Sequence, residues 1–166
     1  MLRRFLYAAA FALAAPASLA QDVDALEAQL DKAREKAPMT IRNFMLSTRP
    51  AKHFGDFESR SGNVVGKDEK LNFYAEPRNL VPKFSNGVYE LGLEVDIEVK
   101  PEKGEAQKQA KFMAVRIPSR SRVQDLYLNM AVSLGGAPPG KYNVKFVVRD
   151  VNSKKSATVA QDVVIK

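Results

Sequence analysis

The chain offers few side chains for nucleophilic or metal chemistry. It has no cysteine, and His53, in RPAKHFGDFE, is its only histidine. A serine nucleophile needs a base beside it, so a Ser-His-Asp set would have to use His53 and Asp56, yet no serine stands in a Gly-x-Ser-x-Gly context. Zinc sites need several Cys or His ligands, and no glycine-rich phosphate loop occurs. We therefore expect no catalytic residue, metal site or cofactor, and a surface position for His53.

Three carboxylates, Glu94, Asp96 and Glu98, alternate along one segment. Glycoside hydrolysis uses two carboxyl groups that face each other across a cleft, whereas alternate residues of a strand share one face. The next segment brings Lys108 and Lys111 to that face. The pattern therefore predicts cross-strand charge pairing on an exposed surface, and its spacing differs from that of a calcium-binding loop.

Basic residues form the second group that can do chemistry. The chain has 26 Lys and Arg against 19 Asp and Glu, a formal charge of +7. Arg116, Arg120 and Arg122 flank Pro118, where we expect a strand to end. The planar fork of arginine suits carboxylate and phosphate groups. These three arginines are our first candidates for binding a partner, and the alternative is a solvated face that keeps the protein soluble.

Residues 76–87, EPRNLVPKFSNG, are a further candidate. The segment is expected to be a long loop between strands, and it carries Leu80, Val81 and Phe84. Apolar residues in a loop either plug the end of a core or form a contact surface. Plugging is the favoured interpretation, and contact with a partner through these three residues is the alternative.

One helix is expected, over residues 22–37, DVDALEAQLDKAREKA. Its apolar residues recur at steps of three and four, Asp24 and Glu27 have capping-box spacing, and Pro38 ends the pattern. A helix this short barely holds alone in water, so its apolar stripe needs a partner. The stripe either docks on the protein's own sheet or frays as a leader; alternatively it self-associates or pairs with a partner's helix.

From Pro38 onward the apolar pattern has a period of two. We expect strands at residues 40–46, 55–60, 70–75, 89–99, 109–117, 126–134, 141–149 and 158–165. Residues 138–157, PPGKYNVKFVVRDVNSKKSA, are predicted to be a turn followed by the hairpin that closes the fold. The preceding strand must end at the two prolines, because proline lacks the N–H that a strand ladder needs. One-sided alternation implies antiparallel sheets with one buried face, and two such faces cover each other in a β-sandwich.

The first residues have the layout of a secretory signal peptide. Arg3 and Arg4 precede an apolar run from Phe5 to Ala15, and small residues lead to Ala20. The run is too short to span a bilayer as a helix. We therefore expect cleavage after Ala20 and a periplasmic or secreted protein that does not span the membrane. The expected parts are a signal peptide (1–20), an N-terminal amphipathic helix (21–38) and a β-sandwich domain (39–166).

The run PPGKYNVKFVVRD, with the polar turn after it and the final ATVAQDVVIK, resembles the last hairpin of immunoglobulin-like and fibronectin-like modules of bacterial exported proteins. GDFESRSGNVVGKDEKLNFYAEPRN is similar in style to exported sandwich proteins. The resemblance implies an immunoglobulin-like antiparallel β-sandwich and a binding, spacing or assembly role.

We therefore expect an exported, non-enzymatic module that binds or assembles with an envelope protein or an anionic envelope surface. Self-association through residues 22–37 is a further expectation, and export argues against nucleic acid as a partner. The alternative is a small periplasmic enzyme, hydrolase-like, with an unrecognised active site.

Overall fold

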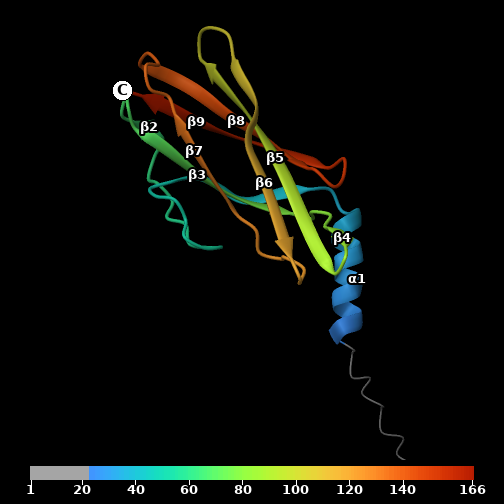
Figure 1. The fold of residues 1–166 in the computed structure, drawn as a ribbon. Coiled ribbons are helices and arrows are strands. Elements are labelled where there is room, and N and C mark those ends of the chain that lie inside the picture. Colours follow the sequence, from blue (N-terminus) through green and yellow to red (C-terminus); the bar gives the residue numbers. More distant parts are fainter. Residues whose placement is uncertain (1–22) are drawn as a thin grey trace, which may run out of the picture.

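The computed structural model describes residues 23–166, and the predicted signal peptide (1–20) lies outside them. One helix, α1 (Val23–Lys36), precedes the strands, so the described chain is mainly β with an N-terminal helix, as the periodicity predicts (Figure 1). The strands are β1 (Thr40–Ser47), β2 (Val64–Val65), β3 (Lys70–Arg78), β4 (Lys83–Ser85), β5 (Val88–Pro101), β6 (Gln107–Ser119), β7 (Leu128–Ser133), β8 (Gly140–Asp150) and β9 (Ser156–Ile165).

The strands form two sheets. The smaller has the order β1-β3-β7, and the larger has the order β2-β9-β8-β5-β4, with β6 also pairing with β5. The predicted closing hairpin is confirmed, since β8 and β9 pair antiparallel from Gly140↔Ile165 onward. In contrast, β2 runs parallel to β9. The larger sheet is therefore mixed, and a strand of two residues is too short to show any alternation in the sequence.

One strand prediction and one loop prediction need correction. Residues 55–60 form no strand and contribute a single bridge, Ser47↔Ser59. Gly55 has a φ of 77° there, in the left-handed region that turns the chain rather than extending it. The expected loop at 76–87 is also partly strand, because β3 continues to Arg78 and β4 forms a hairpin with β5.

The core lies between the two sheets. Phe73 of β3 meets Phe146 of β8 edge to face, with ring centroids 5.0 Å apart, and both side chains are fully buried. Burying a side chain of this size contributes about 1.5–3 kcal/mol. The alternation that predicted β8 is confirmed by the burial of every second residue from Tyr142 to Asp150. The sequence pattern therefore locates the inward faces correctly.

The outer face of the larger sheet carries the predicted charge pairing. Lys108 Nζ lies 3.3 Å from Glu98, and Lys111 Nζ lies 3.2 Å from Glu94. β8 adds the neighbouring cations, with Lys145 Nζ 2.7 Å from Glu98 and Arg149 Nη2 2.7 Å from Asp96 Oδ1. These carboxylates lie on one strand face with cations on both sides, which is the structural arrangement expected of them.

Candidate contact surface

Helix α1 docks on the domain through its charged face. Arg122 donates two hydrogen bonds of 3.0 Å to Glu35 Oε1, and its Nε lies 3.1 Å from Asp31 Oδ2. Lys155 Nζ donates to the Arg34 carbonyl at 3.1 Å and to the Asn79 carbonyl at 2.9 Å. The C-terminal half of the helix is therefore held by two cations of the β domain.

The apolar stripe of α1 is left uncovered. Val23, Leu26 and Leu30 are 64%, 43% and 49% exposed, and no residue of the helix is buried. With 3.6 residues per turn, the stripe lies about 130° around the helix from the face that carries Asp31 and Glu35. Docking of the helix on its own domain was one of the two alternatives. The ion pairs of the polar face make this contact, and the apolar stripe takes no part in it.

Phe84 lies beside this docking point. Its ring is 59% exposed and sits 4.5 Å, centroid to centroid, from the ring of Tyr89, over which the Arg122 guanidinium stacks at 5.2 Å. Arg122 therefore joins the helix to the aromatic pair of the β4–β5 hairpin. Figure 1 shows β4 and the upper half of α1 at the same end of the molecule.

The other two apolar candidates have internal partners. Leu80 is half-buried and packs against the core, which corresponds to a plug. Val81 is also half-buried, and its N–H donates to Asp150 Oδ2 at 2.9 Å while its carbonyl accepts from Asn152 Nδ2 at 3.0 Å. Of the three, Phe84 is the one with an exposed side chain.

The three candidate arginines do not form one cluster. Arg122 is half-buried and turned toward the helix. Arg116 lies across Gly92 on the outer face of β5, so that a Cβ added to Gly92 would collide with its guanidinium. Arg120 is exposed and has no ion-pair partner among residues 23–166. Arg122, which the sequence groups with Arg116 and Arg120, therefore links α1 to the domain.

A small pocket of about 190 Å³ opens between α1 and the smaller sheet. Its charged lining residues are Asp31, Glu35, Arg34, Arg42, Arg78 and Arg122. Arginines outnumber carboxylates in this lining, and three of the four arginines belong to the β domain. The positive charge of the domain therefore faces the two carboxylates of the helix.

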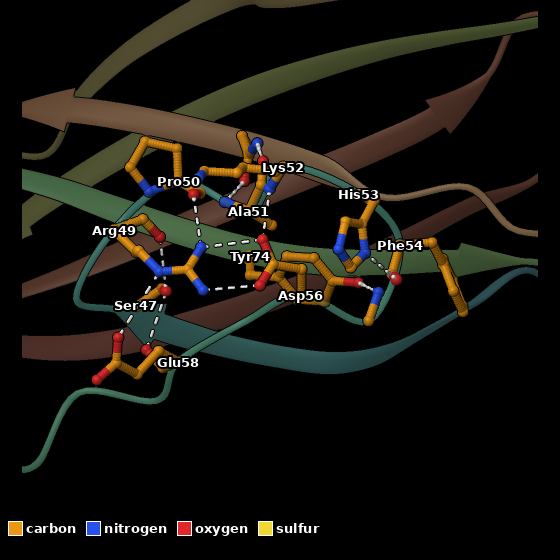
Figure 2. Close-up of polar contacts among 12 residues, drawn as sticks. Ser47, Arg49, Pro50, Ala51, Lys52, His53, Phe54, Asp56, Glu58 and Tyr74 are labelled. Atoms are coloured by element: carbon orange, nitrogen blue, oxygen red, sulfur yellow. Dashed lines mark hydrogen bonds and ion pairs between the residues drawn. The ribbon is translucent and has the colours of Figure 1, made fainter.

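Sequence reasoning missed a second polar cluster, in the loop at residues 48–58. Arg49 donates two hydrogen bonds to the Asp56 carboxylate, of 2.9 Å from Nη1 and 2.7 Å from Nη2, and the Lys52 N–H donates to Asp56 Oδ2 at 2.9 Å (Figure 2). These contacts hold the pKa of Asp56 well below its usual range. His53 is exposed and its Nδ1 lies 3.2 Å from the Phe54 carbonyl. Asp56 thus serves to close the loop and not to orient the histidine.

Tyr74 anchors this loop to the sheet. Its hydroxyl donates to Glu76 Oε1 at 2.8 Å and accepts from the Gly55 N–H at 2.8 Å. Asn43, with a φ of 47° in the bulge of β1, donates to Glu76 Oε2 at 2.9 Å. Burial raises the pKa of Tyr74 to about 12. Polar residues at alternate positions of β3 were the available signal that a loop covers this face.

Among residues 23–166 no helix is long and apolar enough to cross a membrane, and no group of three acidic, histidine or cysteine side chains is placed to hold a metal ion. No protein-family model and no curated protein sequence matches the chain. The sporulation control protein Spo0M from Bacillus subtilis is structurally similar at a TM-score of 0.36 and 8% identity, over 78% of this chain. The chain spans half the length of Spo0M.

Proposed function

We propose that this protein is an exported, non-enzymatic module of the cell envelope that binds or assembles with a partner protein. The signal-peptide layout of residues 1–20 supports export to the periplasm or beyond. Two sheets around one core, closed by the β8–β9 hairpin, support an immunoglobulin-like sandwich. Modules of that kind act mainly as binding, spacing or assembly units.

The uncovered helix stripe is the observation that carries this proposal. We define the helix surface as Val23, Leu26, Leu30 and Phe84, all of them more than 40% exposed. Exposed apolar side chains gathered on one part of a surface mark sites of interaction. An amphipathic helix binds a partner by laying its apolar stripe into a groove or against another helix. The helix surface is therefore the contact site of the module.

The docking of α1 by Arg122 favours the same function. A helix this short is marginal in water when it is free, and ordering it during binding would cost conformational entropy. Ion pairs from Arg122 to Asp31 and Glu35 hold it in place beforehand. The polar face of the helix docks on the domain, so the apolar stripe is already held in helical form before a partner binds.

A hydrolase is the competing function, and the geometry gives it less support. Both Asp56 oxygens accept bonds from Arg49, and His53 contacts a backbone carbonyl. His53→Ala separates the two functions, because loss of a measured activity in that variant would favour the enzyme.

The experiment is capture of a cross-linked envelope partner by the mature protein. Leu26→Ala with Leu30→Ala should abolish capture, since it removes the centre of the stripe without touching Asp31 or Glu35. Gln29→Ala, an exposed position on the same helix but off the stripe, is the matched control and should capture normally. A double variant that captures the same partner as the wild type would refute the proposal.

A further inference from the structure

The free edge of β6 is a second candidate binding surface, because its backbone groups have no neighbouring strand in the described chain. β6 pairs with β5 alone, so its other edge has no strand neighbour in the described chain. Two features interrupt that edge, the left-handed Lys111 (φ 51°) and Pro118, which lacks an N–H. Between them, residues 113–117 pair in regular register with residues 91–95. This run presents unpaired N–H and C=O groups, the template for an added strand.

A row of partly exposed apolar side chains lies on the inner face of this edge strand. Phe112, Met113, Val115 and Ile117 pack against the core but remain partly exposed. They stay open because a sheet of three strands does not cover the full width of the larger one. At Phe112 the row adjoins a cavity of about 930 Å³ between the β5–β6 end of the larger sheet and the residues that follow β7. Figure 1 shows the β5–β6 and β7–β8 turns at that same end of the molecule.

The positive charge of β6 favours binding of an acidic chain. Its 13 residues include Lys108, Lys111 and Arg116 and no acidic residue. Lys108 and Lys111 already contact Glu98 and Glu94, yet their side chains remain 71% and 68% exposed. Arg116 has no acidic partner among residues 23–166. An approaching acidic strand would meet complementary charge.

We propose that the free edge of β6 accepts an extended acidic peptide segment of a partner protein as an additional strand. Main-chain hydrogen bonds to residues 113–117 would hold it, since only an extended chain can pair with a sheet edge. Successive side chains of a strand point to opposite faces. Apolar residues at alternate positions would pack against the row of apolar side chains beside Val115, and acidic residues between them would face Arg116. This surface is separate from the helix surface and does not depend on it.

The probe is a short synthetic peptide in which valine and aspartate alternate. Titrated into the isotopically labelled mature protein, it should slow hydrogen exchange of the β6 amides and shift their resonances. Binding should weaken roughly tenfold from low to high salt, because exposed charges are screened. A peptide of the same composition in scrambled order is the control and should bind at least tenfold more weakly.

N-methylation makes the test specific for strand addition. Methyl groups on alternate peptide nitrogens remove the N–H groups of one edge of the peptide and leave the other edge intact. One of the two alternate-methylated peptides should bind like the parent and the other should fail. Equal binding of both, or no binding of the parent peptide, overturns the proposal.

Variants of the protein locate the site independently. Val115→Ala should weaken peptide binding about tenfold by removing apolar contact with the peptide, whereas Val64→Ala, at an exposed valine of β2, should not. Arg116→Gln should reduce the salt dependence. Leu26→Ala with Leu30→Ala should leave peptide binding unchanged, so failure here is distinguishable from failure of the helix surface. Dimerisation of the protein alone that protects the β6 amides would assign the edge to a second copy and overturn the proposal.

Discussion

The guanidinium carbon of Arg122 lies 5.2 Å from the centroid of the Tyr89 ring. Stacking of this kind is worth roughly 0.5–1 kcal/mol at an exposed site. Because the same guanidinium also binds Asp31 and Glu35, one side chain links the helix to the β4–β5 hairpin. The position of the helix surface depends on this residue.

Arg122→Ala should release α1 from the domain. The ion pairs and the stacking together contribute about 1–2 kcal/mol to docking, and the freed helix is too short to persist alone. Hydrogen exchange of the amides of residues 23–36 should accelerate by about 5- to 30-fold, while exchange in β8 stays unchanged.

Arg120→Ala is the matched control for that measurement. It also removes an arginine two residues away, but Arg120 is exposed and its side chain touches neither the helix nor Tyr89. Exchange in α1 should remain at the wild-type rate. Equal acceleration in both variants would show that overall charge, rather than the contact with Arg122, holds the helix.

Phe84 and Phe146 should differ sharply in their effect on stability. Phe146→Ala empties the centre of the core and should lower the free energy of unfolding by about 3–5 kcal/mol. Phe84 is 59% exposed, so Phe84→Ala should change it by less than about 0.5–1 kcal/mol. Urea unfolding of the two variants measures both values. A large loss in Phe84→Ala would mean that this ring is structural and would remove it from the helix surface.

Asp96 should make stability depend on pH in the acidic range. Its bonds from Arg149 and from the Lys111 N–H lower its pKa to about 2, against about 3.9 in an unfolded chain. A lowered pKa stabilises the fold above the unfolded value, and that contribution is lost as pH falls toward the folded value. Asp96→Asn should therefore cost about 0.5–1 kcal/mol near neutral pH and progressively less between about pH 4 and pH 2.

Urea unfolding across that pH range tests the contribution of Asp96. Glu105→Gln, in the exposed β5–β6 turn, provides the control for losing a carboxylate that forms no ion pair with residues 23–166. Its difference from the wild type should be small at every pH. An Asp96→Asn difference that stays constant down to pH 2 would contradict the assignment of the low pKa to this group.

The sequence predicts the regular parts of the fold and fails where short-range contacts compete with periodicity. Strands β5 and β8 were found because each has one wholly apolar face. β2 and β4 were missed because two or three residues carry no period. Residues 55–60 alternate weakly, but the Arg49–Asp56 pair and the turn at Gly55 draw this segment into a loop.

The candidate site was predictable in composition but not in arrangement. Alternating acids, with lysines in the next strand, predict charge pairing on one face, and that pairing is confirmed. The particular contact of Lys111 with Glu94 was not predictable, because the register pairs Glu94 with Ala114 and shifts beside it. Arg122 and Glu35 are 87 residues apart in sequence. No local pattern shows that they meet, and three arginines near Pro118 therefore resembled one patch although they point to different surroundings.

The hydroxyl of Tyr74 should be the main anchor of the loop at residues 48–58. Tyr74→Phe keeps the ring and removes the bonds to the Gly55 N–H and to the buried carboxylate of Glu76. Leaving buried polar groups unpaired costs about 1–3 kcal/mol. The free energy of unfolding should fall by that amount, and exchange of the Gly55 amide should accelerate.

The alkaline titration gives an independent measure of the same contact. Tyr74 should ionise near pH 12, as burial raises its pKa to about 12, while an unperturbed tyrosine ionises near pH 10. A raised pKa means that stability is intact below pH 10 and declines as pH rises toward 12. Tyr127→Phe is the matched control, because its hydroxyl donates only to the exposed Lys52 carbonyl. The late tyrosinate absorbance step should disappear in Tyr74→Phe and persist in Tyr127→Phe, and the reverse result would place the anchor on Tyr127.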